Sequence, residues 1–163
     1  MKPYFILGID PGVSGGLVVI DCYGELKRAV VMPRLAKGID FTGLVKELVL
    51  IHREFLPKIY LEELRPYRMS AYTSFSMGLY YGYLQAALKM NLMSYEFISP
   101  SVWCRTMHLG CDKGLKPKAK SVQVLKDKWP KVDLRKNDKC KINHDGLVDA
   151  FLIAQYGLLE MNK

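Results

Sequence analysis

The chain has 163 residues, of which 50% are hydrophobic, and a formal net charge of +8. This composition argues against a disordered chain, and the lack of about 18 consecutive apolar residues argues against a membrane span. The length suits one domain over residues 1–163 with a sizeable core, and four cysteines without a C-x-x-C pair favour a reduced, cytoplasmic protein.

The first part of the chain predicts three strands followed by a helix. Strands are expected over residues 4–10, 16–22 and 25–32, and the tight turns between them make neighbouring strands antiparallel. A helix is expected over residues 40–55, because apolar residues recur there at helical spacing until Pro57 ends the run. This part therefore predicts an antiparallel meander with one helix after it.

The second part alternates strands and helices. Strands over 58–64 and 94–99 flank a long helix over 70–90, and the chain after Pro100 is helical in pieces, the last over 143–160. Such alternation implies parallel strands joined by helices. We therefore expect an α/β fold with a mixed five-stranded sheet, in which three antiparallel strands are joined by two parallel additions and helices flank the sheet.

Acidic residues occur at the ends of two predicted strands. Asp10 closes the first strand beside a Gly-rich turn, and Glu62 and Glu63 point to opposite faces of the fourth strand. One glutamate shares a face with Asp10 if these two strands are neighbours. Structural roles are the alternatives, with Asp10 accepting hydrogen bonds from the turn and Glu62 lying on the surface.

A second pair of acids lies near the C-terminus. Asp145 and Asp149 are four residues apart on one predicted helix, so they share a face beside its apolar stripe. Asp145 has the alternative role of an acid favoured by the helix dipole. Two strand acids and a helical pair are the oxygen ligands that two Mg²⁺ or Mn²⁺ ions need for phosphodiester hydrolysis. No small-molecule cofactor is expected.

The positive charge is concentrated in one segment. Eleven of the 24 basic residues, but four of the 16 acidic ones, lie between Cys111 and Lys141. A segment of this kind is typical of proteins that bind a polyanion such as nucleic acid. The alternative is a solvated lysine-rich surface. Phosphodiester chemistry and a basic segment point to the same kind of substrate, which favours nucleic acid.

Four stretches carry a family resemblance: FILGIDPGVSGG, YLEEL, PSVW and NHDGLVDAFLIAQYG. In this order and spacing they resemble RuvC-type Holliday-junction resolvases, especially the short forms of phages and other viruses. The resemblance implies a ribonuclease H-like fold and a homodimer that nicks two strands of a four-way DNA junction symmetrically, in DNA recombination and repair. It also implies Mg²⁺ or Mn²⁺, water as the nucleophile, 5′-phosphate and 3′-hydroxyl ends, and the cytoplasm of a bacterial or virus-infected cell.

The resemblance assigns the catalytic and metal-binding acids residue by residue. Asp10 matches the family's first-strand aspartate, Glu62 its glutamate, and Asp149 the acid before the final apolar run. The fourth acid of bacterial members lies three residues before Asp149, where this chain has Gly146. Asp145, one residue earlier, takes that role here, and both spacings keep one helical face.

The resemblance also points to DNA contacts. Lys120 matches a catalytic lysine near the scissile phosphate, with Lys118 as the alternative. Arg65 occupies the position of an aromatic residue that bacterial members wedge into the junction, and Tyr67 follows it. His144 is a further candidate ligand or proton carrier. The expected nucleic-acid-binding residues are Arg65, Tyr67, Lys113, Lys116, Lys118 and Lys120.

A row of small residues lies in the predicted helix over 70–90. Gly78, Gly82 and Ala86 recur every four residues, and small residues let a neighbouring element approach closely. Packing of the helix on its own sheet and contact within a homodimer are both compatible with this row.

Other functions remain as alternatives. Sugar kinases and actin-like ATPases also begin with a G-x-D-x-G turn, but they need two such domains and have no use for Asp145 and Asp149. The same four acids would serve a ribonuclease H-like nuclease on RNA–DNA hybrids or on other branched DNA. A binding module would hold branched DNA on the basic segment without cutting it.

Overall fold

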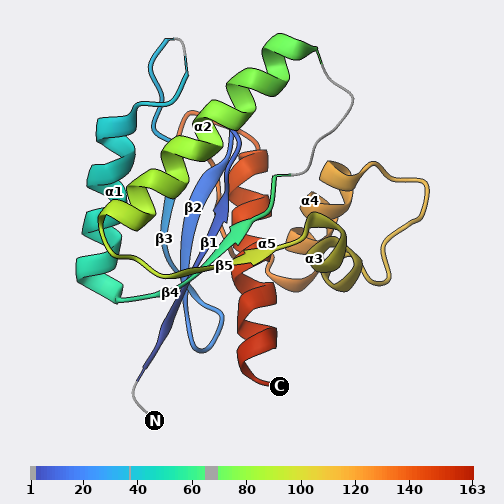
Figure 1. Ribbon diagram of the computed structural model, residues 1–163. Coiled ribbons are helices and arrows are strands. Elements are labelled where there is room, and N and C mark those ends of the chain that lie inside the picture. The colour runs from blue at the N-terminus through green and yellow to red at the C-terminus, as the bar shows by residue number, and fades with distance from the viewer. Residues whose placement is uncertain (1–2, 37, 65–69) are drawn as a thin grey trace.

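The computed structural model describes residues 3–36, 38–64 and 70–163, which form five strands and five helices (Figure 1). The strands are β1 (Phe5–Asp10), β2 (Gly16–Asp21), β3 (Leu26–Val31), β4 (Lys58–Glu62) and β5 (Tyr95–Ile98). The helices are α1 (Phe41–Phe55), α2 (Ala71–Met90), α3 (Pro100–Met107), α4 (Pro117–Lys128) and α5 (Asp145–Met161). The helical pieces expected after Pro100 are thus α3, α4 and α5, and the strand expected over 58–64 ends earlier, at Glu62.

The five strands form one mixed sheet in the order β3-β2-β1-β4-β5. β1 pairs antiparallel with β2, and β2 antiparallel with β3, whereas β4 is parallel to both β1 and β5. The predicted sheet is confirmed in its strand number and directions. Ile9 pairs with Leu61 in the β1–β4 register, so the next residue of each strand, Asp10 and Glu62, reaches the same edge of the sheet.

Helices cover both faces of the sheet (Figure 1). Alternate strand residues such as Ile6 and Val18 point to a core shared with α3, α4 and α5, whereas Leu7 and Val19 point to a second core shared with α1 and α2. No helix within the described ranges is long and apolar enough to cross a membrane.

The helix ends explain where α1 and α2 lie. The Asp40 side chain caps α1 by accepting a 3.0 Å hydrogen bond from the Gly43 amide, and Ser70 caps α2 in the same way. α1 ends at Leu56, which adopts a left-handed conformation with φ 47, and Pro57 then starts the path into β4. The Asp40 cap and the turn at Leu56 thus set where α1 begins and ends in the crossover from β3 to β4.

α5 packs unusually closely on β1 and on the β1–β2 turn. A Cβ atom added to Gly8 would collide with the backbone of Ala150 in α5, and one added to Gly146 would collide with the backbone of Ser14. Glycine is therefore required at both positions for the close approach. This packing sets the height of α5 above the end of β1, and with it the position of the acidic residues that α5 carries.

Candidate active site

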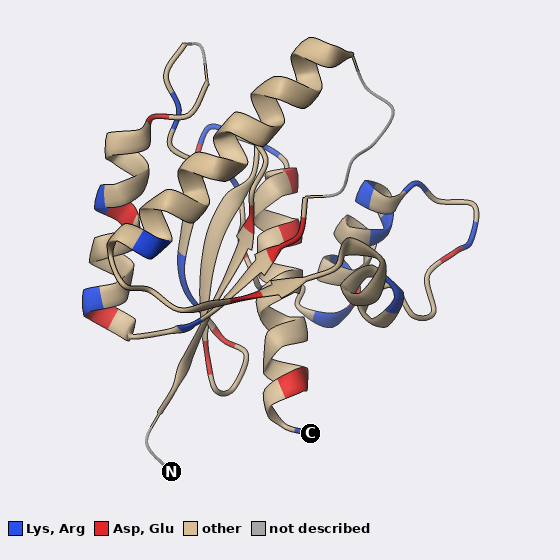
Figure 2. Cartoon of the chain, in the orientation of Figure 1, with Lys and Arg blue, Asp and Glu red and all other residues tan. Residues whose placement is uncertain are grey.

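Three acidic side chains meet at the carboxyl ends of β1 and β4. Asp10 ends β1, Glu62 ends β4, and Asp149 reaches the same place from the second turn of α5. Figure 2 shows the acidic positions of β4 and of the first half of α5 close to one another. Asp10 and Asp149 lie near enough to Glu62 for each to raise its pKa. The structure therefore brings together the two strand acids and one acid of the helical pair.

The pKa values of these acids are all raised. Burial, then the charges of Asp10 and Asp149, raises the pKa of Glu62 to about 7, although a hydrogen bond from Trp103 opposes the shift. Burial also raises the pKa of Asp149 to about 6 and raises that of Asp10, with Gly12 and Lys118 acting in the opposite direction on Asp10. Three carboxylates that are costly to ionise together would be stabilised by a cation between them.

Within the described residues, the hydrogen bonds at this site leave one buried carboxylate oxygen without a partner. Asp10 Oδ1 accepts a 3.1 Å hydrogen bond from the Gly12 amide, and Glu62 Oε1 accepts a 2.8 Å bond from Trp103 Nε1. Asp149 Oδ1 is buried and has no hydrogen-bond partner in the described part of the chain. An orphaned buried oxygen beside two other carboxylates is a place for an unseen polar ligand.

These residues fit a hard divalent cation by their chemistry. Mg²⁺ and Mn²⁺ prefer carboxylate oxygens, and all three side chains supply only oxygen. In the ranges that the structure covers, however, no group of three or more His, Cys, Asp or Glu side chains is arranged to hold a metal ion. The three carboxylates therefore share one site without standing in a finished coordination geometry.

Asp145 lies apart from the other three acids. It is the first residue of α5, it is exposed, and its Oδ2 lies 3.4 Å from Lys118 Nζ. Its charge makes the smallest contribution to the raised pKa of Asp149. The next residue toward Asp149 is Gly146, which must be glycine because a side chain there would collide with the β1–β2 turn. Asp145 thus lies at the rim of the site and also suits the positive end of the helix dipole.

Two lysines of α4 occupy different surroundings. Lys118 lowers the pKa of both Asp10 and Asp149 and pairs with Asp145, so it faces the acidic site. Lys120 instead lies near His108 at the end of α3, where its charge lowers the pKa of the imidazole. Lys113 and Lys116 are exposed just before and at the start of α4. Of the two lysines singled out from the sequence, the alternative is the one that lies beside the acids.

Basic residues surround two hollows next to Asp145. The first measures about 280 Å³, and its lining includes Lys118, Lys136 and His144. The second measures about 450 Å³, and its lining includes Lys126, Lys131, Arg135 and Lys141. Ile142, Asn143 and Asp145 line both hollows, so the two adjoin. Figure 2 shows the Lys and Arg positions gathered over α4 and the segment after it. A polyanion bound there would pass the rim of the acidic site.

A smaller cavity opens on the other side of the acids. It measures about 110 Å³ and is lined by Asp10, Glu62 and three α2 residues, Met77, Tyr80 and Tyr81, among others. Arg65 and Tyr67, the predicted junction-contacting pair, lie outside the described residues. Sequence reasoning did not anticipate the part of α2 in this cavity, because the 20-residue helix shows no apolar stripe that separates one face from another.

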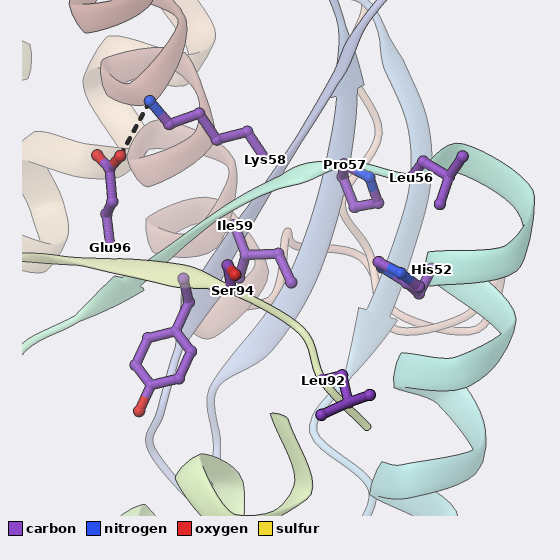
Figure 3. A pocket seen from close by; sticks show the side chains of 9 residues that line it. His52, Leu56, Pro57, Lys58, Ile59, Leu92, Ser94 and Glu96 are labelled. Atoms are coloured by element: carbon purple, nitrogen blue, oxygen red, sulfur yellow. Dashed lines mark ion pairs between the residues drawn. The ribbon is translucent and has the colours of Figure 1, made fainter. Parts of the chain in front are cut away.

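A further pocket lies at the opposite end of β4 (Figure 3). It measures about 460 Å³, and its lining includes Leu56, Leu92 and the Lys58–Glu96 ion pair of 3.0 Å. Lys58 begins β4 and Glu62 ends it, so the strand separates this pocket from the acidic site.

His144 and Trp103 also border the acidic region. His144 caps α5 without a side-chain hydrogen bond, and its Nδ1 is buried without a partner among the described residues. Burial lowers the pKa of His144, so its imidazole is neutral at pH 7. Trp103, which contacts Glu62 directly, belongs to the PSVW stretch, and its role could not be read from sequence.

Comparisons with known proteins give a likeness in structure alone. No protein-family model and no curated protein matches the chain. A solved structure of T. thermophilus RuvC in complex with a Holliday junction substrate matches with a TM-score of 0.68 and 16% identity, over 98% of this chain and 96% of that one. A structure of Thermus thermophilus RuvC matches with a TM-score of 0.63 and 16% identity, over 97% and 96% of the two chains.

The match extends over nearly the whole of both chains and includes the mixed sheet with helices on both faces. At this identity the likeness concerns the fold. The chain therefore has the RuvC-like α/β fold, of the ribonuclease H-like type that its sequence motifs predict.

Proposed function

We propose that the protein is a metal-dependent, structure-selective DNA endonuclease that resolves four-way junctions by paired symmetric nicks. The observation that carries this proposal is the meeting of Asp10, Glu62 and Asp149 beside the lysine-rich helix α4. A fold shared with a RuvC solved in complex with a Holliday junction supports a branched DNA substrate. The expected products carry 5′-phosphate and 3′-hydroxyl ends.

The acids divide into a half-buried cluster of three and an exposed residue at the rim. Asp10, Glu62 and Asp149 would hold Mg²⁺ or Mn²⁺, and Asp145 would complete the site from the rim once α4 engages DNA. When bound, such ions lower the pKa of water and neutralise charge on the phosphate. The raised pKa values of Glu62 and Asp149 support this proposal, because burial and mutual repulsion make these carboxylates costly to ionise and a bound cation would offset that cost.

The lysines would bind and orient the DNA backbone. Lys118 faces the acids, so we assign it the place beside the scissile phosphate, while Lys120, Lys116 and Lys113 would contact phosphates farther along. An ammonium there would stabilise negative charge as it develops on the leaving oxygen. Phosphate contacts release counterions, so junction binding should weaken steeply with salt.

We also propose that the protein acts as a homodimer through α2. The N-terminal half of α2 is exposed and apolar, with Tyr72 81% and Phe75 70% accessible. Among the described residues, a Cβ atom added to Gly78 or Gly82 would meet nothing within 4 Å, so these glycines do not pack on the chain's own sheet. An uncharged surface of this kind is costly to leave in water, and a second copy would cover it.

Cleavage of synthetic DNA tests the proposal. An end-labelled four-way junction, a linear duplex and an RNA–DNA hybrid are incubated with the protein in Mg²⁺ or in EDTA. We expect paired nicks in the junction alone, lost in EDTA and in Asp10→Asn but retained in Asp127→Asn, which removes an exposed acid of α4. Junction binding without cleavage would identify a binding module, and cleavage of the hybrid alone would identify a different substrate.

A further inference from the structure

The hairpin of α3 and α4 lies beside two of the three clustered, half-buried acids, Glu62 and Asp149. Trp103 of α3 is 3% exposed, and its Nε1 donates a 2.8 Å hydrogen bond to Glu62 Oε1, which lies 41 residues earlier in the chain. Figure 1 shows α3 and α4 beside α5, on the face of the sheet opposite α1 and α2. The hairpin therefore reaches the acidic site through a side chain that is itself buried.

The bond between Trp103 and Glu62 fixes the direction of the carboxylate. An indole N–H can only donate, so it holds an oxygen of Glu62 whether or not the group is ionised. A donor to one oxygen leaves the other available, and a fixed side chain loses less freedom when it binds a cation. Removing the donor would leave Glu62 equally buried but free to turn.

Ser121 of α4 lies beside Asp149. Its buried hydroxyl is near enough to lower the pKa of Asp149, and it also lies 3.4 Å from the Pro117 carbonyl oxygen, while Asp149 Oδ1 has no partner among the described residues. His108 Nε2 lies 3.0 Å from Ser121 Oγ, and the His108 ring packs edge-on against Trp103 with centroids 5.6 Å apart. If Ser121 donates its one proton to Asp149, His108 Nε2 must donate to Ser121.

We propose that Trp103 and Ser121 are positioning residues, with which the α3–α4 hairpin orients Glu62 and Asp149 toward a divalent cation. This inference rests on the proposed function of the same site. The geometry that carries this inference is the Trp103–Glu62 hydrogen bond, and His108 contacts both Trp103 and Ser121, so the two helices reach the acids as one unit. Partners that orient metal ligands in this way commonly affect metal affinity by about 10- to 100-fold.

The test measures Mn²⁺ binding to the DNA-free protein by calorimetry at pH 8. Trp103→Phe keeps an aromatic ring but removes the donor, and Trp129→Phe is its matched control because the Trp129 ring packs edge-on against the Phe151 ring. Ser121→Ala is compared with Ser101→Ala, in which the removed hydroxyl contacts Ser99. We expect Kd for Mn²⁺ to rise about tenfold in Trp103→Phe and Ser121→Ala and to change less than about twofold in the controls.

Junction cleavage gives a second readout. Added Mn²⁺ should rescue the cleavage rate if Trp103 and Ser121 position metal ligands, but not if their role is purely structural. In Trp103→Phe and Ser121→Ala, the lost rate should return as Mn²⁺ is raised about tenfold, with KM for the junction unchanged. Circular dichroism checks that each variant is folded. If Trp103→Phe does not fold, the Kd of Ser121→Ala for Mn²⁺ tests the positioning role.

Two outcomes separate this inference from the proposed function. If both variants bind Mn²⁺ as the parent protein does, while Asp10→Asn binds weakly, the positioning role is overturned and the metal site stands. If the parent protein binds no Mn²⁺, or Asp10→Asn binds it unchanged, both the positioning role and the metal-dependent function are overturned.

Discussion

Replacing Glu62 with glutamine should make the metal-free protein more stable. The pKa of Glu62 is raised from 4.5 to about 7, so between these pH values the folded state holds more protons than the unfolded state. Stability therefore falls as the pH rises through this window, and by pH 8 the loss approaches ~3 kcal/mol. Glutamine carries no charge, and its amide oxygen can still accept the bond from Trp103.

Thermal unfolding in EDTA at pH 5 and pH 8 measures this effect. Because relaxation reduces the penalty, we expect Glu62→Gln to gain about 1–3 kcal/mol at pH 8, or roughly 3–10 °C in Tm, and much less at pH 5. Glu96→Gln is the control, since it breaks only the exposed pair with Lys58 and should change stability by less than about 1 kcal/mol. Mg²⁺ should then raise the Tm of the parent protein more than that of Glu62→Gln. An equal or lower Tm for Glu62→Gln at pH 8 would refute the idea that these half-buried carboxylates repel one another when ionised.

Three further predictions concern the lysines, the glycines and α2. Lys118→Ala should reduce junction cleavage more than Lys120→Ala at saturating Mg²⁺, measured as kcat, because Lys118 faces the acids; equal losses would count against that placement. Gly146→Ala should cost about 1–3 kcal/mol in urea unfolding through collision with the β1–β2 turn, whereas Gly82→Ala, which meets nothing within 4 Å among the described residues, should gain up to ~1 kcal/mol in the monomer as a better helix former and should weaken the proposed dimer. Phe75→Glu should shift sedimentation from dimer to monomer with an unchanged circular dichroism spectrum, since Phe75 is 70% exposed on the single chain, and an unchanged dimer would place the interface elsewhere.

The sheet and its two acids were predictable because local rules determine them. Short turns require β1, β2 and β3 to be antiparallel, and the helices on either side of β4 require parallel pairing. Once β1 and β4 are neighbours, the register places Asp10 and Glu62 at one edge. None of these steps depends on a side-chain contact distant in sequence.

The remainder of the site depends on contacts that no local pattern encodes. Lys118 and Lys120 are two residues apart on α4, about 200° around the helix, so they face different sides. Only the packing of the buried Ser121, Val124 and Leu125 decides which lysine faces the acids. The Trp103–Glu62 bond joins residues 41 positions apart, and its prediction would need the α3 orientation.

Backbone packing determines where the acids of α5 lie. Gly8 and Gly146 let α5 approach β1 and its turn, which sets where the Asp149 backbone lies and prevents a side chain at position 146. The acid near the start of α5 therefore lies at Asp145, which is exposed and pairs with Lys118, apart from the half-buried Asp10, Glu62 and Asp149. If the proposed DNA substrate binds along α4, its phosphates would compete for Lys118 and release Asp145, so that DNA binding and completion of the acidic site would be linked through one ion pair.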